Sequence, residues 1–277
     1  MKIQYCCTYW GSEHDDADRF VNKVVEAGYD GIEINLPPPH TGFTAALLAR
    51  LDEVRKHRPD FILIVQQLTA PQGDTVAGYI SRMQQQLREL AAWQPHFINS
   101  QTGADYYSFD DNCRVLEAAL EISQQTGVRI LHETHRSKFS FHAATLLPYL
   151  RAFPELELAG DFSHFCTVSE SMLQEQADIL QQIMPRVSHI HARVGHEQAA
   201  QVADPFAPEW QQHLLQFEAW WQQIIRQKQQ AGWQQFTITP EFGPAPYMPA
   251  VPFTRQPLGH QWHINHQMML RLRQQWQ

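Results

Sequence analysis

The sequence is poor in cysteine, and its few cysteines show no metal-binding or redox spacing. Among 277 residues there are four, Cys6, Cys7, Cys113 and Cys166, and none of them stands in a C-x-x-C pair. This excludes a small fold that depends on a disulfide framework. We expect the four thiols to be reduced and mainly structural.

The chain also lacks long apolar runs and a surplus of positive charge. No apolar run reaches the roughly 18 residues of a membrane span, and the first residues carry no apolar region with a cleavage site. The formal net charge is −8, which disfavours binding to nucleic-acid phosphates or anionic membranes. We expect a cytoplasmic protein that acts on a small molecule, with neither nucleic acid nor membrane as a partner; the sequence leaves its oligomeric state open.

Apolar and aromatic residues are abundant. Hydrophobic residues make up 43% of the chain and aromatic residues 11%, which is ample for a large buried core. The length allows one large domain or two ordinary ones, and no break in composition marks a boundary. We therefore expect one domain over residues 1–277. The 15 histidines are a further hint of metal or proton chemistry.

Strand and helix patterns alternate along the whole chain. The expected strands are 3–10, 32–36, 61–65, 97–100, 129–133, 156–161, 187–195 and 236–239. The expected helices are 15–26, 44–56, 75–92, 109–126, 143–153, 170–184, 210–230 and 259–276. Such a repeat in this length predicts a (β/α)8 TIM barrel, with its chemistry at the carboxyl ends of the strands. The alternative, an open doubly wound sheet, usually has a Gly-rich phosphate turn after its first strand, and residues 10–14 do not form one.

Two connections are long and rich in proline. They cover residues 195–208 and 243–257, and both follow late strands. On the catalytic side of a barrel such loops act as lids or set specificity. Plain surface loops stiffened by proline remain the alternative.

The expected strand 187–195 alternates polar with small or apolar residues. Its polar residues His189, His191 and Arg193 fall at every second position, so on a strand all three point to one face. Because the run leads into a Pro-rich loop, we expect this face to look inward, towards a site.

The ends of the last four strands each carry a strong metal ligand. These residues are Glu133, Asp161, His191 and Glu241. Adjacent strand ends are neighbours in a barrel, so the four side chains are expected to converge. Three carboxylates and one imidazole form a hard ligand set, which favours one Mn²⁺ or Mg²⁺ ion, with Co²⁺ or Zn²⁺ as alternatives.

This ordered set resembles the xylose isomerase-like TIM barrel superfamily. Within it, the chain is most similar to the sugar phosphate isomerase/epimerase branch, which includes tagatose and psicose 3-epimerases and inosose dehydratases. The resemblance implies that Glu133, Asp161, His191 and Glu241 bind one divalent metal. It also implies that Glu133 and Glu241 act as the acid/base pair of an enediolate mechanism, and that His164 contacts a substrate oxygen.

The chain departs from the epimerases at two positions. Glu197 stands where they carry an arginine, and Phe139 stands where they carry a second glutamate. Cations near the expected metal indicate instead a carboxylate or phosphate on the substrate. Besides His164, which the resemblance implies, the residues expected to bind substrate are Arg193, His135, which shares a strand-like face with Glu133, and the neighbouring Arg136 and Lys138; solvated loop cations are the alternative for Arg136 and Lys138.

The sequence thus predicts a metal-dependent isomerase or epimerase of a small sugar, sugar acid or keto-polyol. A metal-dependent dehydratase of a keto-polyol such as an inosose is an alternative, because the same base and metal can expel a β-hydroxyl. A barrel that binds metal and ligand without turnover is a third. A nuclease related to endonuclease IV is disfavoured by the acidic charge balance.

Overall fold

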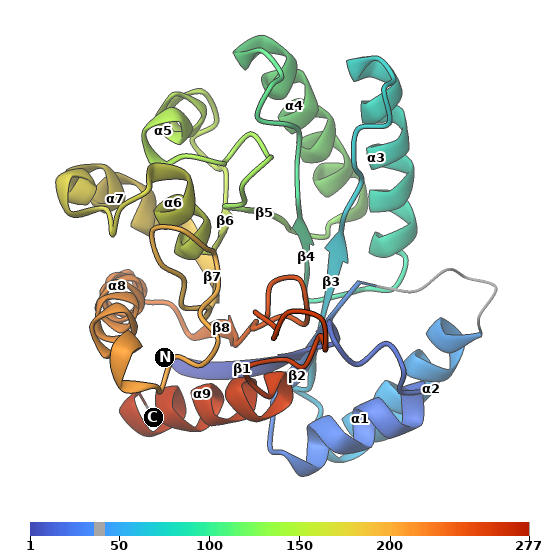
Figure 1. The fold of residues 1–277 in the computed structure, drawn as a ribbon. Helices are drawn as coiled ribbons and strands as arrows, with labels where there is room; N and C mark the ends of the chain where they lie inside the picture. The colour runs from blue at the N-terminus through green and yellow to red at the C-terminus, as the bar shows by residue number, and fades with distance from the viewer. Residues whose placement is uncertain (36–41, 277) are drawn as a thin grey trace.

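The computed structural model describes residues 1–35 and 42–276 and shows a closed barrel of parallel strands (Figure 1). The strands follow one another around the barrel in sequence order, and β8 closes it by pairing with β1. Their bounds are β1 Lys2–Thr8, β2 Gly31–Ile34, β3 Ile62–Gln67, β4 Phe97–Ser100, β5 Ile130–Glu133, β6 Leu158–Gly160, β7 Val187–His191 and β8 Gln235–Thr239. The predicted (β/α)8 TIM barrel is confirmed.

The helices form the outer layer around the strands. Their bounds are α1 Ala17–Glu26, α2 Phe43–His57, α3 Val76–Ala91, α4 Phe109–Thr126, α5 Ala143–Ala152, α6 Phe162–Ser169, α7 Ala177–Ile183, α8 Gln211–Gln230 and α9 Gln261–Trp276, with short 3-10 turns η2 Gln174–Gln176, η3 Met184–Arg186 and η4 Pro208–Trp210. Local signals set several ends. The Ser108 side chain caps α4 by accepting from the Asp111 N–H, and Gly127 ends the helix at φ 71°.

Inside the barrel the side chains change from apolar to polar along each strand. Phe97 and Leu131 belong to a buried apolar cluster of strand residues, and two positions further along their strands stand Asn99 and Glu133. Because every second residue of a strand points to the same face, these pairs share the barrel interior. The polar interior therefore lies at the carboxyl ends of the strands.

One predicted helix is wrong in its position. The sequence suggested a single helix over residues 170–184, whereas the structure has α6 before that range and α7 inside it. Asp161 begins α6, because its side chain accepts from the Ser163 N–H. Glu170 and Leu173 then adopt the left-handed conformation and separate the two helices.

The predicted seventh strand is shorter than expected. β7 ends at His191, and the Arg193 N–H donates to the His191 carbonyl in a tight turn. His189 and His191 do point inward, but Arg193 approaches the site from the loop after the strand. At the second strand, the predicted end at Leu36 and the following prolines lie outside the described residues.

The thiols were expected to be reduced, and the structure agrees with this expectation. All four cysteines lie in the described part of the chain and are free, and three of them are buried. Within residues 1–35 and 42–276, no helix is long and apolar enough to cross a membrane.

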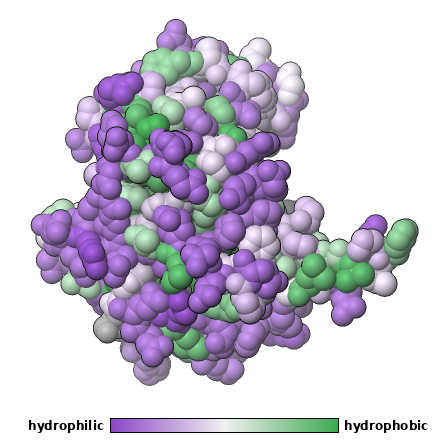
Figure 2. Space-filling model, turned by 60° about the vertical axis from the view of Figure 1, so that its left-hand side comes forward, coloured by the Kyte–Doolittle hydropathy of each residue, from purple (hydrophilic) through white to green (hydrophobic). Residues whose placement is uncertain are grey.

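The long loop between β8 and α9 stands out from the barrel. It runs in front of the strands in Figure 1, and Figure 2 shows a narrow arm with hydrophobic residues that projects to the right, where this loop lies. Val251, Phe253 and Leu258 are exposed on it, while Tyr247 and Met248 near its start turn back towards the body. The start of this loop therefore covers the carboxyl end of the barrel.

We expect acid to destabilise the fold partly through His132 on β5. This side chain is buried, its Nδ1 lies 2.7 Å from the Thr102 hydroxyl, and burial lowers its pKa from 6.5 to about 4. A lowered histidine pKa means that the unfolded chain binds the proton first, so stability is lost as pH falls from 6.5 to about 4. The loss amounts to about 3 kcal/mol.

Urea unfolding of wild type and His132→Leu at pH 7 and pH 4 measures this contribution. The wild-type free energy of unfolding should fall more steeply than that of the variant, by about 3 kcal/mol. His57→Leu, at an exposed position of α2, is the control and should keep the wild-type slope. Equal slopes for wild type and His132→Leu would contradict the assignment.

Candidate functional site

The four residues predicted as metal ligands meet at the carboxyl end of the barrel. Glu133 ends β5, Asp161 follows β6, His191 ends β7 and Glu241 follows β8. All four side chains are buried, and one ligand atom from each lies within 4.8 Å of the others. The barrel therefore brings together residues that are more than 100 positions apart in the sequence.

His191 is the centre of this group. Its Nδ1 lies 2.9 Å from Glu241 Oε2 and 3.4 Å from Glu133 Oε1, yet this buried nitrogen has no hydrogen-bond partner among the described residues. Burial disfavours a charge on the ring, but the Glu241 and Glu33 carboxylates outweigh it and raise the pKa of His191. A nitrogen without a hydrogen bond between carboxylates fits a bound cation.

Glu33, on β2, holds the other side of the same imidazole. His191 Nε2 lies 2.9 Å from Glu33 Oε1, and His189 Nε2 lies 3.1 Å from Oε2. The buried carboxylate also accepts hydrogen bonds from the residues Gln66 at 3.1 Å, Asn99 at 2.9 Å and Thr239 at 2.6 Å. An imidazole whose Nε2 faces a carboxylate presents Nδ1 to a metal in a fixed orientation.

Arg193 balances the negative charge of the ligand group. It is buried, and its guanidinium donates to the Asp161 carboxylate and lies 3.9 Å from Glu241 Oε2. The same group lies 2.7 Å from His164 Nε2. Although burial opposes the charge, Asp161 and Glu241 raise the pKa of Arg193. Arg193 is thus already paired inside the protein.

The other residues predicted to bind substrate lie at different depths. The rings of His164 and His135 are 3.9 Å apart at their centroids, so these two side chains are in contact. Arg136 lies 4.9 Å from the centre of the Tyr247 ring. Lys138 is buried without a hydrogen bond or ion pair from its side chain to any described residue, and burial lowers its pKa. Neither Arg136 nor Lys138 lines the cavity described next.

A cavity of about 550 Å³ is lined by Glu133 and Glu241, two of the four candidate ligands. Aromatic and aliphatic side chains line one part of it, and polar or charged side chains line the rest: Tyr9, Trp10, Leu68 and Tyr247, then Glu13, Asn35, Gln66, Gln101, Glu133, His135, Arg193 and Glu241. Its volume lies in the range of small-molecule sites. A larger cavity of about 780 Å³, between the β1–α1 loop and the start of α9, shares Trp10 but contains none of the four ligands.

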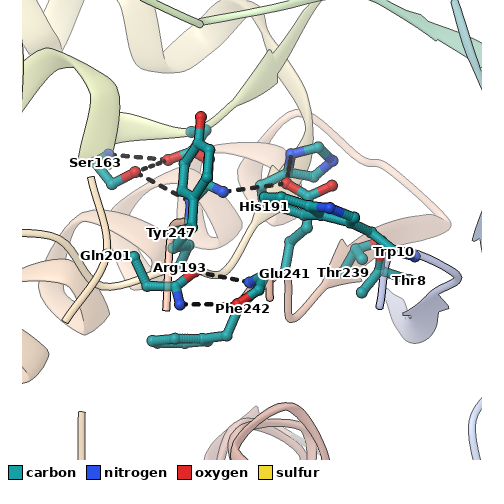
Figure 3. A network of polar contacts seen from close by, with 12 residues as sticks. Thr8, Trp10, Ser163, His191, Arg193, Gln201, Thr239, Glu241, Phe242 and Tyr247 are labelled. Carbon is teal, nitrogen blue, oxygen red and sulfur yellow. Dashed lines mark hydrogen bonds and ion pairs between the residues drawn. The ribbon is translucent and has the colours of Figure 1, made fainter. Parts of the chain in front are cut away.

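Tyr247 covers Arg193 at the edge of the smaller cavity. Its ring centre lies 4.8 Å from the Arg193 guanidinium and 5.0 Å from the Trp10 ring (Figure 3). The Trp10 ring in turn lies against Gly243, where a Cβ would come within 2.2 Å of it. A glycine at position 243 is therefore needed for Trp10 to form the wall of the cavity.

Sequence reasoning missed part of this environment. Gln66, Asn99 and Tyr247 were not singled out, although the alternation of β3 and β4 places the first two inward after Ile64 and Phe97. Gln101, which follows β4, donates to Glu133 Oε2 at 3.0 Å. Gln67 on β3 faces the helix layer, where its Nε2 lies 3.2 Å from Gln86 Oε1.

Comparisons with known proteins support the fold. No known family model matches the sequence, and no curated protein matches it either. A probable 3-DHS dehydratase, AsbF of Bacillus anthracis, is 18% identical with a TM-score of 0.64, covering 98% of each chain. A D-tagatose 3-epimerase-like protein is 14% identical with a TM-score of 0.61, covering 98% of this chain and 96% of that one.

A third similar structure was solved with a metal. It is a xylose isomerase-like TIM barrel protein from Mycobacterium smegmatis in complex with magnesium, 11% identical with a TM-score of 0.58, covering 97% of this chain and 96% of that one. The fold of the chain is therefore that of the xylose isomerase-like TIM barrels.

Proposed function

We propose that the protein is a divalent-metal-dependent isomerase or epimerase of a small sugar, sugar acid or keto-polyol. The observation that carries the proposal is the buried group Glu133, Asp161, His191 and Glu241 beside a cavity of about 550 Å³. The donor set and the unpartnered His191 Nδ1 fit one Mn²⁺ or Mg²⁺ ion. Proteins with this fold include sugar epimerases and a metal-bound barrel, which supports the same class of chemistry.

The bound metal would polarise a carbonyl and hydroxyl of the substrate and so make the neighbouring C–H acidic. Glu133 and Glu241 are the residues that would take and return that proton. Burial raises the pKa of Glu133, but the charge of the nearby His191 outweighs burial and lowers the pKa to about 2. Glu133 is therefore ionised at neutral pH and able to accept a proton.

The aromatic and the polar side chains that line the cavity would contact different parts of the substrate. Tyr9, Trp10 and Tyr247 would pack against the apolar face of a small polyol and exclude water, while Gln66 and Gln101 would bind its hydroxyls. Arg193, which lines the cavity, would contact a substrate oxygen, and His164, which does not line it, would hold the Arg193 guanidinium in place.

A dehydratase is the second candidate, and His135 is the observation that favours it. This imidazole lines the cavity next to Glu133, and burial lowers its pKa, so it is neutral at neutral pH. A neutral imidazole beside the acidic C–H could take its proton and, as the imidazolium so formed, pass it to the β-hydroxyl, which then leaves as water while the C=C bond forms. Mass spectrometry of the product separates the two, because a dehydratase removes 18 mass units of water and an isomerase leaves the mass unchanged.

Metal analysis of the purified protein tests the proposal. We expect about one Mn²⁺ or Mg²⁺ per chain in wild type and a large loss of metal in His191→Ala and Glu133→Gln. His213→Ala, a partly exposed histidine of α8, is the matched control and should keep its metal. Unchanged metal content in both site variants would refute the site. Metal without solvent-proton exchange into any ketose would indicate a binding protein.

A further inference from the structure

The backbone just after Glu241 is held by two side-chain amides. β8 ends at Thr239, and beyond it the Phe242 N–H donates to Asn265 Oδ1 at 2.8 Å while Asn265 Nδ2 donates to the Phe242 carbonyl at 2.9 Å. The Gly243 N–H donates to Gln201 Oε1 at 2.7 Å, and Gln201 Nε2 donates to the Gly243 carbonyl at 3.1 Å. Each amide therefore takes the place that a neighbouring strand would occupy.

The two amides come from different parts of the molecule. Asn265 belongs to α9, and Gln201 to the loop between β7 and α8; Figure 3 shows Gln201 beside Phe242 and Glu241. Asn265 thus holds the backbone of Phe242 and Gln201 that of Gly243, and both side chains are buried.

The position of Glu241 depends on these hydrogen bonds to the backbone that follows it. Its carboxylate lies 2.9 Å from His191 Nδ1 and accepts from Gln66 Nε2 at 3.0 Å, but both of these partners come from other strands. Behind it, the Trp10 ring against Gly243 leaves no space for the backbone to shift in that direction. The backbone clamp fixes where the Glu241 carboxylate can reach.

We propose that Gln201 and Asn265 are positioning residues that set the distance between Glu241 and His191, and hence the affinity of the metal centre. The inference rests on the proposed function. Neither amide touches the ligand group, so both act through the backbone of residues 241–243. Partners of this kind, one step removed from the metal, typically change its affinity by about 10- to 100-fold.

Titration calorimetry with Mn²⁺ on metal-free protein is the test. Gln201→Ala and Asn265→Ala should each weaken Mn²⁺ binding by about 10-fold or more at a temperature where the variants are folded. Hydrogen exchange at the Phe242 and Gly243 amides should rise in parallel. The two variants release different backbone residues, Gly243 and Phe242, so either one tests the inference if the other does not fold.

Asn112→Ala is the matched control. Asn112 makes the same pair of bonds to another backbone residue, Ala104, at 3.3 and 3.0 Å, and this residue carries no ligand. It should lose stability but bind Mn²⁺ as wild type does. Wild-type affinity in folded Gln201→Ala or Asn265→Ala would overturn the inference and leave the proposed function standing. A wild type that binds no Mn²⁺ would overturn the proposed function and the inference with it.

Discussion

Replacing Glu241 with glutamine is expected to lower turnover by about 10²- to 10⁴-fold, the range usual for loss of a general acid or base. Glutamine fills the same space and can still accept the hydrogen bond from Gln66, but it cannot take a proton. Incorporation of solvent deuterium and product formation, both with the ketose that wild type converts, measure the effect.

Proton exchange at the opposite face of the substrate distinguishes the role of Glu241 from that of Glu133. If Glu133 and Glu241 serve opposite faces, Glu241→Gln should still exchange the proton handled by Glu133 more readily than it completes the reaction. Glu13→Gln is the control, because Glu13 lines the same cavity and is absent from the ligand group. Turnover of Glu241→Gln within about threefold of wild type would contradict an acid/base role.

Replacing Glu33 with alanine is expected to lower the free energy of unfolding by about 3–5 kcal/mol, the usual cost of removing one partner of a buried charged pair. The change takes one acceptor from each of five buried donors, among them both ring nitrogens that face it on β7, and only Gln66 keeps a carboxylate acceptor, Glu241. It should also weaken the metal centre, because His191 loses the carboxylate that orients it.

Glu33→Gln separates charge from shape in the same test. It keeps the volume and one oxygen acceptor, so urea unfolding should place it between wild type and Glu33→Ala. Glu53→Ala on α2, where the carboxylate is exposed, should show little change. If Glu33→Ala unfolds at the same urea concentration as wild type, Glu33 is not the anchor that its contacts indicate.

The fold and the meeting of the four candidate ligands were predictable because both follow from short-range patterns. Strand residues alternate, strands and helices repeat, and strong ligands such as Glu133 and His191 stand at strand ends. In a closed barrel the ends of consecutive strands are adjacent, so these residues can be placed together before their side-chain packing is known.

The residues that tune the site were harder to predict because their contacts span the whole chain. Glu33 meets His191 across 158 positions, and Gln201 meets Gly243 through a loop whose path no local pattern sets. The predicted path of Arg193 was wrong in one respect, since a tight turn after His191 takes it off the strand. The start of α6 could have been found, because Asp161 is one of the residue types preferred at a helix N-cap.

The two halves of the barrel contribute differently to the polar interior. All four candidate ligands come from β5 to β8, whereas Glu33, Gln66 and Asn99 come from β2, β3 and β4. The second half thus carries the groups that would meet a metal, and the first half carries the carboxylate and the two amides that orient Glu241 and His191. Substitutions on β2 to β4 would therefore change the metal affinity of the candidate ligands on β5 to β8. A fragment that begins at Ile130 would keep all four candidate ligands but lose Glu33, whose carboxylate holds His191 in place.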